Sequence, residues 1–199
     1  MDSLRAIELV FCSANQHKAD EMRSLLPAWI RLETMRDIGL ITDIPETGDS
    51  FADNALIKSR FVYEKTNKVV FSDDSGLEVD CLNGAPGIHT ARYAGKGATS
   101  AQNVSKLLTE MTGCENRRAR FVCCLSLIIG GKEFVFQDVV NGRITLTPSG
   151  GAGFGYDPVF IPDGYNHTFA ELSSDLKNQI SHRGKAVHQM VQFLEEFGG

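Results

Sequence analysis

Apolar positions in the first third of the chain predict a strand, a polar loop and a helix in succession. An apolar run predicts a strand over residues 7–12, and a polar loop, 13–18, follows it. Residues 18–26 carry apolar side chains at helical spacing, and Pro27 ends or follows that helix. A helix start placed after a strand and a polar loop presents backbone N–H groups that can bind an anion. A capped helix start with a solvated Lys18 is the alternative.

A longer helix is predicted after an acidic, loop-rich connection over residues 36–50. Ser50 is a good N-cap for a helix that runs to about Lys65. The inward stripe of this helix is mostly apolar, but it also carries Asn54 and Lys58. Lys58 either reaches past apolar surface to solvent or takes a buried anion-binding role, and this stretch does not separate the two.

Two adjacent carboxylates, Asp73 and Asp74, follow a short buried strand over residues 69–71. Ser75 and Gly76 are predicted to end that strand in a turn. Open α/β folds place their chemistry at the ends of sheet strands. Because adjacent strand residues point to opposite faces, we expect the two carboxylates to have different roles. For an isolated Asp-Asp pair, the start of a solvated loop is the more common explanation.

The rest of the chain predicts further strands, a hairpin and three helices. The predicted strands cover 77–82, 119–129 and 133–140, and the helices cover 100–111, 172–180 and a last segment that ends near Phe197. Gly130 and Gly131 form the hairpin turn, and Asn141-Gly142 is either a second turn or a bulge in one long strand. The inward face of the last helix is predicted to be Val187, Met190, Val191, Leu194 and Phe197.

A glycine-rich loop over residues 147–155 carries Phe154 among its glycines. An aromatic side chain on such a loop suits stacking on a flat ligand, and a core plug is the alternative. Lys177, His182 and Arg183 form a basic cluster near the chain's last two helices, for which a capping or surface role is the simpler explanation.

Composition narrows the functional classes. The chain has 199 residues, of which 42% are hydrophobic and 23% charged, as in ordinary soluble enzymes. The net charge of −5 argues against wrapping of nucleic acid, and no apolar run reaches membrane-spanning length. The N-terminus lacks the apolar core of a secretory signal. Five cysteines without a CxxC pair predict neither a disulfide framework nor a zinc site, which fits a reducing cytoplasm. Cys12, Cys123 and Cys124 are predicted to be buried thiols.

Three chemical ingredients therefore coexist: oxygen ligands for a hard cation, cations for phosphates, and a loop that can hold a base. The carboxylates are Glu46, Asp73 and Asp74, and the cations are Lys18, Lys58, Lys177 and Arg183. Together they predict a Mg²⁺-dependent nucleotide site at which a carboxylate accepts a proton from water. No serine or cysteine nucleophile with a paired histidine is evident, so direct attack by water is favoured.

Six motifs keep one order and spacing over nearly the whole chain. They occupy residues 13–18, 46–58, 72–77, 84–93, 153–158 and 180–184. In these motifs the chain resembles the inosine triphosphate pyrophosphatase family, also called Ham1-like proteins. Any single motif is weak, but six in register are highly specific.

The resemblance implies hydrolysis of the non-standard purine nucleoside triphosphates ITP, dITP and XTP to the monophosphate and pyrophosphate. It implies an α/β fold: a single domain over residues 1–199, with a long mixed central sheet flanked by helices and two lobes around an active-site cleft. A homodimer, Mg²⁺ and a cytoplasmic location are further implications, with no nucleic-acid or membrane partner.

The resemblance also implies residue roles. Glu46 and Asp74 would bind Mg²⁺, Asp74 would accept the proton of the attacking water, and Asp73 would support the metal site. Substrate-binding roles are implied for Ser13, Ala14, Asn15, Gln16, His17, Lys18, Lys58, Ser75, Phe154, Gly155, Tyr156, Asp157, Lys177, His182 and Arg183. Phe154 would stack on the base. A donor such as Arg183 aimed at a 6-keto oxygen would disfavour adenine, whose 6-amino group cannot accept that hydrogen bond.

Small departures from the family pattern bear on fine specificity. Ala14 stands where glycine is common, Ala152 interrupts the glycine loop, and His89 replaces a frequent tyrosine. The two alanines lack the conformational freedom of glycine and can reshape the phosphate and base loops. Two alternatives remain: a pyrophosphatase of other modified or standard nucleotides, and a nucleotide-binding module that has lost catalysis. The intact carboxylates argue against the second.

Overall fold

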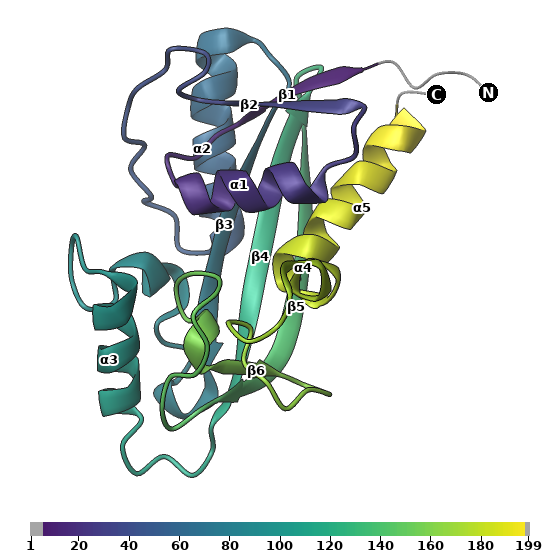
Figure 1. The fold of residues 1–199 in the computed structure, drawn as a ribbon. Helices are drawn as coiled ribbons and strands as arrows, with labels where there is room; N and C mark the ends of the chain where they lie inside the picture. Colours follow the sequence, from purple (N-terminus) through teal and green to yellow (C-terminus); the bar gives the residue numbers. More distant parts are fainter. Residues whose placement is uncertain (1–5, 198–199) are drawn as a thin grey trace. The chain divides into compact units, whose positions relative to one another are not determined.

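The computed structural model describes residues 6–197 and contains a six-stranded mixed sheet flanked by helices (Figure 1). The strands, in the order β2-β1-β3-β4-β5-β6, are β1 (Ile7–Phe11), β2 (Ile30–Thr34), β3 (Val70–Val79), β4 (Arg118–Ile129), β5 (Lys132–Ile144) and β6 (Phe160–Pro162). The α-helices are α1 (Gln16–Leu25), α2 (Phe51–Thr66), α3 (Ser100–Glu110), α4 (Ser174–Ile180) and α5 (His182–Phe197). β1 pairs in parallel with β2 and β3, whereas β5 and β6 are antiparallel. The expected mixed α/β sheet is confirmed.

The chain forms two compact units, each with its own hydrophobic core. Unit 1 comprises Met1–Asp74, Cys123–Gln137 and Gly184–Gly199, and unit 2 comprises Ser75–Val122 and Asp138–Arg183. Strands β3, β4 and β5 contribute residues to both units.

In unit 1, the alternation of side chains along β1 and β3 places α1 and α2 against different apolar surfaces. Leu9, Phe11 and Phe71 share a core cluster with the buried side chains of α1 and α5. Val10 and Val70 pack instead in a second cluster with α2. Because successive strand residues alternate in direction, odd and even positions of β3 face different helices. This alternation determines where the two aspartates of β3 point.

In unit 2, the core gathers aromatic and aliphatic side chains from β3, α3, β4 and the segment around β6. Leu77 and Leu107 are fully buried there, and the ring of Phe121 packs edge-on against Phe160 with centroids 4.7 Å apart. Phe169 lies in the same aromatic group. The core therefore supports the strand end and the loops that carry the candidate ligand residues of this unit.

The predicted turn at Ser75-Gly76 is wrong, because β3 continues without interruption from Val70 to Val79. The strand predicted over 77–82 is the end of β3, followed by a 3₁₀ turn at Asp80–Leu82. The sequence Asp-Asp-Ser-Gly is typical of a turn, but here it continues a strand. The strand is possible because both buried carboxylates form ion pairs with lysines. Strands β2 and β6 were not predicted, although the sequence of β2 alternates between apolar and polar residues as strands commonly do.

Several local predictions were confirmed and one was not. Ser50 caps α2, since its side chain accepts a hydrogen bond from the N–H of Asp53. Asn141-Gly142 lies inside the single long strand β5, so a second hairpin turn is excluded. On the last helix, Phe197 is 46% exposed and does not belong to the inward face. It lies in the helix's terminal turn and contacts the rings of Phe134 and Phe193 instead.

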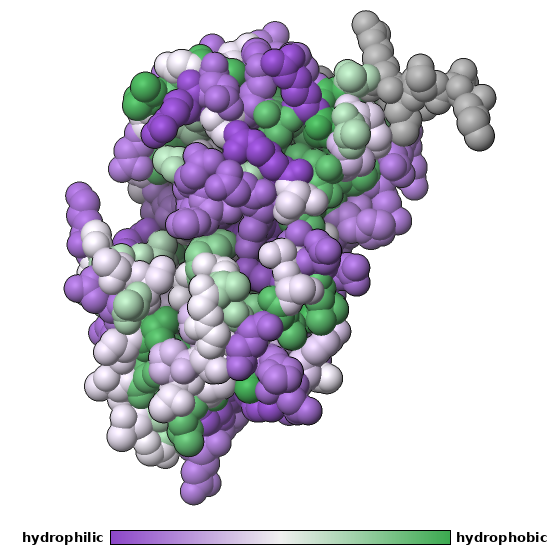
Figure 2. Space-filling model, in the orientation of Figure 1, coloured by the Kyte–Doolittle hydropathy of each residue, from purple (hydrophilic) through white to green (hydrophobic). Residues whose placement is uncertain are grey.

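The outer face of α1 is hydrophilic (Figure 2), and three cysteines are buried. Figure 2 shows hydrophilic side chains over the outer face of α1, where Gln16, His17 and Asp20 are exposed. No helix within residues 6–197 is both long and apolar enough to cross a membrane. The predicted buried thiols of Cys12, Cys123 and Cys124 are confirmed.

Candidate active site

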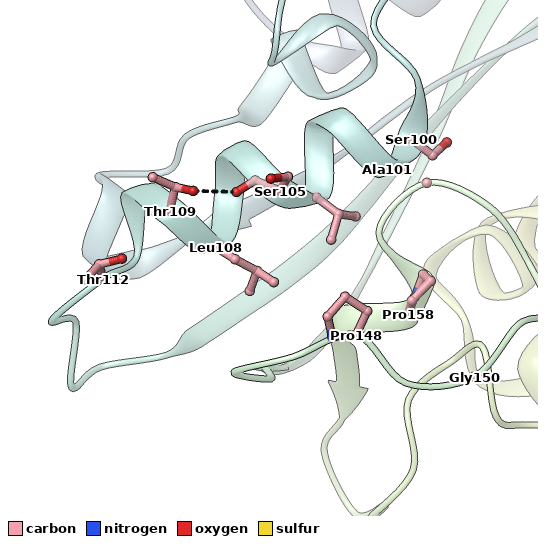
Figure 3. Close-up of a pocket in the computed structure, with 11 residues that line it drawn as sticks. Ser100, Ala101, Ser105, Leu108, Thr109, Thr112, Pro148, Gly150 and Pro158 are labelled. Carbon is pink, nitrogen blue, oxygen red and sulfur yellow. Dashed lines mark hydrogen bonds between the residues drawn. The ribbon is translucent and has the colours of Figure 1, made fainter.

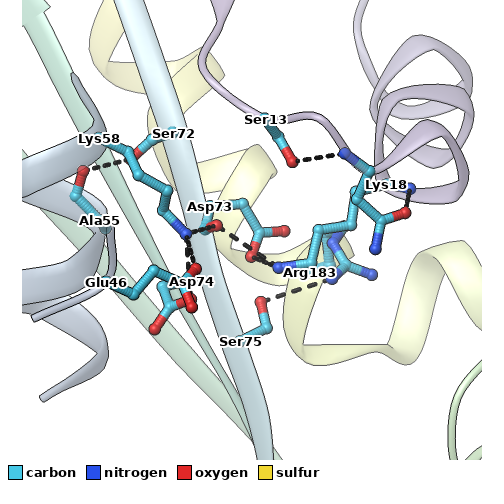
Figure 4. Close-up of polar contacts among 11 residues, drawn as sticks. Ser13, Lys18, Glu46, Ala55, Lys58, Ser72, Asp73, Asp74, Ser75 and Arg183 are labelled. Atoms are coloured by element: carbon cyan, nitrogen blue, oxygen red, sulfur yellow. Dashed lines mark hydrogen bonds and ion pairs between the residues drawn. The ribbon is translucent and has the colours of Figure 1, made fainter. Parts of the chain in front are cut away.

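Lys58, a buried lysine on α2, forms ion pairs with two carboxylates of unit 1 (Figure 4). Lys58 Nζ donates to Glu46 Oε1 at 2.9 Å, to Asp74 Oδ1 at 3.0 Å and to the carbonyl oxygen of Asp73 at 2.9 Å. The Lys58 side chain is only 9% exposed. A lysine that reaches past apolar surface to solvent is therefore excluded. The burial that the other alternative requires is confirmed, and its anion-binding role stays a prediction.

The two aspartates of β3 contact different helices, as their alternation requires. Asp73 lies on the face of α1, and its Oδ1 accepts from Lys18 Nζ at 2.9 Å. Asp74 lies on the face of α2 with Lys58. Lys18 is 14% exposed and Asp73 is fully buried, so the solvated-lysine alternative for the first loop is wrong. The expectation that the two carboxylates face opposite sides of the strand is confirmed, and their different roles stay a prediction.

Charge and burial compete at the Lys58–Asp74 pair. Burial alone would lower the pKa of Lys58, but Asp74 and Glu46 more than offset this and hold the pKa above its ordinary value. Burial raises the pKa of Asp74, and the attraction of Lys58 and Lys18 offsets only part of that rise. The ammonium is thus charged at neutral pH, and Asp74 is a stronger base than an exposed aspartate.

The donor atoms of unit 1 fit a magnesium ion shared with a substrate. Glu46 and Asp74 are held close together because both accept from one ammonium group. Asp74 Oδ2 is buried and has no hydrogen-bond partner within residues 6–197. No cluster of three or more His, Cys, Asp or Glu side chains that could cage a metal occurs in that same range. Magnesium commonly uses one or two carboxylates and takes its remaining ligands from phosphates and water.

The loop before α1 folds on its own polar groups. Asn15 caps the helix by accepting from the N–H of Lys18, and Ser13 Oγ accepts from the N–H of Asn15. Ala14, Gln16 and His17 are exposed. The helix start is therefore capped, as one alternative predicted, and its remaining N–H groups point along the helix axis as in any anion-binding helix terminus.

Phe154 in unit 2 lies near two cations and outside the core. Lys177 Nζ is 5.2 Å and Arg183 Cζ 5.6 Å from the centre of its ring. These are distances at which cations are attracted to the face of an aromatic ring. The ring is partly exposed and does not belong to the unit's core cluster, so the core-plug alternative is wrong.

Asp157 fixes the glycine loop that carries Phe154. Its Oδ2 accepts from the backbone N–H of Phe154 at 2.8 Å and from Lys177 Nζ at 2.7 Å. Gly153 has a φ of +75°, and a side chain there would strike the Asp157 carboxylate. The loop conformation thus depends on glycine at residue 153 and on a buried ion pair beneath it.

His182 and Arg183 of unit 2 are buried rather than on the surface. The ring of His182 is stacked on Phe121, with centroids 4.8 Å apart and an interplanar angle of 8°. Arg183 is 3% exposed and donates to Ser75 Oγ at 3.4 Å (Figure 4). A surface role for this basic cluster is therefore wrong, whereas a capping role is not tested by these contacts. Phe121 supports His182, but no sequence signal distinguished it from an ordinary core residue.

Tyr156 lies in the hydrophobic core of unit 2, and its hydroxyl donates to the carbonyl oxygen of Thr90.

Gly155 lines a separate cavity of about 620 Å³ between α3 and the glycine loop (Figure 3). The lining residues of that cavity are Ser100, Ala101, Val104, Ser105, Leu108, Thr109, Thr112, Pro148, Gly150, Gly155 and Pro158. None of them is charged, so this cavity is not where the carboxylates and lysines act.

Comparison with known proteins gives one consistent result. Residues 9–193 match the Ham1 family. A Flavobacterium johnsoniae protein named dITP/XTP pyrophosphatase is 44% identical over 94% of this chain and 98% of its own length. A Bacillus subtilis protein of the same name is 41% identical over 94% and 97%. The solved Staphylococcus aureus Ham1 protein has a TM-score of 0.86 and 39% identity, covering 95% of this chain and 98% of that chain. The chain belongs to the Ham1 family.

Proposed function

We propose that this protein hydrolyses ITP, dITP and XTP to the nucleoside monophosphate and pyrophosphate, with Mg²⁺ and with water attacking the α-phosphate. Its relatives over nearly the whole chain are named dITP/XTP pyrophosphatases, so the chain is an enzyme of the nucleoside triphosphate pyrophosphatase class. The observation that carries the mechanism is the buried ammonium of Lys58, shared by Glu46 and Asp74.

The residues of unit 1 are proposed to act on the triphosphate. Glu46 and Asp74 would hold Mg²⁺, which neutralises phosphate charge and orients water when it is bound. Lys18 and Lys58 would bind phosphate oxygens as point charges. Ser13, Ala14, Asn15, Gln16 and His17 would contribute hydrogen bonds from the helix start, chiefly through the backbone.

Asp74 is the proposed proton acceptor. Its buried Oδ2, which has no hydrogen-bond partner within the described residues, can accept a hydrogen bond from water. As the water oxygen bonds to the α-phosphorus, its proton passes to Asp74, and the bond from that phosphorus to the bridging oxygen breaks to release pyrophosphate. The raised pKa of Asp74 increases its basicity. Asp73 supports this arrangement through its ion pair with Lys18.

The residues of unit 2 are proposed to recognise the base. Phe154 would stack on the purine, and Arg183 would donate to its 6-oxygen, which adenine lacks. Ser75, Gly155, Tyr156, Lys177 and His182 would complete the binding residues, Tyr156 through its backbone because its side chain is buried. Asp157 would keep the loop in place through Phe154 and Lys177.

A cytoplasmic location and a homodimer are proposed as well. The cytoplasm is supported by the five cysteines, which form no disulfide in the described part of the chain. The homodimer is supported by the family resemblance. The alternative of a binding module without catalysis is disfavoured because binding a polyanion would not require buried carboxylates at the same ammonium.

Hydrolysis of ITP in ¹⁸O-labelled water tests the position of attack. We expect one ¹⁸O atom in the IMP product and none in the pyrophosphate, because water bonds to the α-phosphorus. Mass spectrometry of both products gives the result. Label in pyrophosphate, or inosine diphosphate and inorganic phosphate as products, would contradict the proposed reaction while leaving nucleotide binding open.

A further inference from the structure

A buried asparagine on α2 holds the segment that carries Glu46. Asn54 is fully buried, and its Oδ1 accepts from the backbone N–H of Gly48 at 2.8 Å. Gly48 lies two residues after Glu46, whose carboxylate contacts Lys58 one helical turn beyond Asn54. One short segment is therefore fixed at two points along the same helix.

The contact at Gly48 leaves no room for a side chain. A Cβ atom at this residue would lie 2.5 Å from Cβ of Asp53 and 2.9 Å from the backbone nitrogen of Asn54. Real Cβ contacts at such distances do not occur without a shift of the backbone. Glycine is required here by close approach to the first turn of α2, so the segment lies directly on the helix.

The same asparagine has a second, unusual feature. Its Nδ2 is buried and has no hydrogen-bond partner within residues 6–197. Leaving a buried donor unsatisfied destabilises the folded state, because the group has lost its hydrogen bonds to water. Such groups are rare in native proteins, and functional demands are one reason that they persist. An apolar residue of similar size would avoid the cost but would lose the bond to Gly48.

We propose that Asn54 is a positioning residue that presets Glu46 beside Asp74 for Mg²⁺ binding. The inference rests on the proposed function, because it takes Glu46 as a metal ligand. Asn54 acts on the metal through Gly48 and the backbone and does not touch the substrate. Loss of the contact lets the segment move, so the carboxylate pair must be ordered again each time Mg²⁺ binds.

The chain offers a matched control in Asn103 on α3. This residue is also buried, and its Oδ1 accepts from the backbone N–H of Ala94 at 2.8 Å. Its Nδ2 donates to the carbonyl oxygen of Ala91. Asn103 thus makes the same kind of helix-to-loop contact within unit 2, with none of the proposed Mg²⁺ ligands among its partners.

The test compares Asn54→Ala, Gly48→Ala, the double variant, Asn54→Asp and Asn103→Ala. We expect Mg²⁺ binding, measured by titration calorimetry on the complex with a non-hydrolysable ITP analogue, to weaken about tenfold in each of the first two variants. The double variant should be no weaker than the worse single one, because both changes remove one contact. Asn54→Asp keeps the acceptor oxygen and should bind Mg²⁺ within about threefold of wild type. Asn103→Ala should lose thermal stability but keep wild-type Mg²⁺ affinity.

Hydrogen exchange at the Gly48 amide gives a readout that does not depend on metal or activity. Asn54→Ala should exchange this amide at least about tenfold faster, and Asn103→Ala should not. Wild-type Mg²⁺ affinity in folded Asn54→Ala and Gly48→Ala, or equal weakening in Asn103→Ala, would overturn the inference. Wild-type protein that binds no Mg²⁺ would overturn the proposed metal site instead, whereas unchanged exchange at Gly48 would overturn the positioning contact itself.

Discussion

Asp74→Asn is expected to lower kcat by about 10³-fold while nucleotide binding stays measurable. The change removes the proposed proton acceptor, and general bases typically contribute about 10²–10⁴-fold to rate. Lys18 and Lys58, the lysines that we propose to bind phosphate, remain in this variant. Single-turnover kinetics and equilibrium binding of ITP measure the two effects separately.

Stability should not fall in this variant at neutral pH. The pKa of Asp74 is raised in the folded protein, so its contribution to the free energy of unfolding is present below its ordinary pKa and is lost as pH rises through the folded value. Asparagine removes a buried charge that is unfavourable at pH 7, and Lys58 keeps Glu46 as its partner. Asp73→Asn is the matched control, with a smaller loss of kcat. Near-normal turnover in Asp74→Asn would refute its role as base.

Lys58→Met is expected to destabilise the protein by about 3 kcal/mol, because two carboxylates lose their shared buried cation. For a chain of this size the melting temperature should fall by about 6–12 °C. The pKa of Lys58 is raised above its ordinary value in the folded protein. The stabilisation that its charge provides is therefore fully present at pH values below the ordinary pKa of lysine, and it is lost as the pH rises through the higher pKa of the folded state. Lys58→Met should therefore lose the full stabilisation at pH 8. At pH 5 the loss of stability should be smaller, because the carboxylates begin to take up protons.

Added Mg²⁺ should recover part of this stability, since a second cation can neutralise Glu46 and Asp74. Thermal melts at both pH values, with and without Mg²⁺, measure these effects. Arg60→Met on the same helix is the control: its ion pair with Glu133 is half exposed and should contribute less than about 1 kcal/mol. If Lys58→Met melts like Arg60→Met, the buried ion network does not stabilise unit 1.

Local signals predicted some elements well and failed where partners are distant in the sequence. The start of α2 followed from Ser50 and from a clear helical stripe. The continuation of β3 did not, because the ion pairs that allow two buried aspartates in a strand come from Lys18 and Lys58 on other elements. The three-residue strand β6 is too short for any period to show.

The candidate site shows the same division. Residue types and motif order predicted which residues form the site, but they did not predict which of these residues contact one another. The sequence did not decide whether Lys58 is buried. The apolar stripe of α2 gives no information on Asp74, the partner that allows the lysine to be buried. The cations near Phe154 were not predictable as its neighbours, because Lys177 and Arg183 come from α4 and α5, later in the chain. Asn54 was visible as an odd polar residue in an apolar stripe, yet only its contact with Gly48 indicates a role.

The most direct measurement is pyrophosphate release from ITP, XTP, GTP and ATP, with and without Mg²⁺. The proposed function predicts Mg²⁺-dependent release from ITP and XTP, with ATP and GTP nearly inert. Equal release from all four would keep the reaction and contradict specificity for non-standard purines. Release from ATP as fast as from ITP would contradict recognition of the 6-oxygen by Arg183, whereas release from GTP would not, because guanine also carries a 6-oxygen. No release from any of them, with ITP binding intact, would contradict catalysis and favour a nucleotide-binding module.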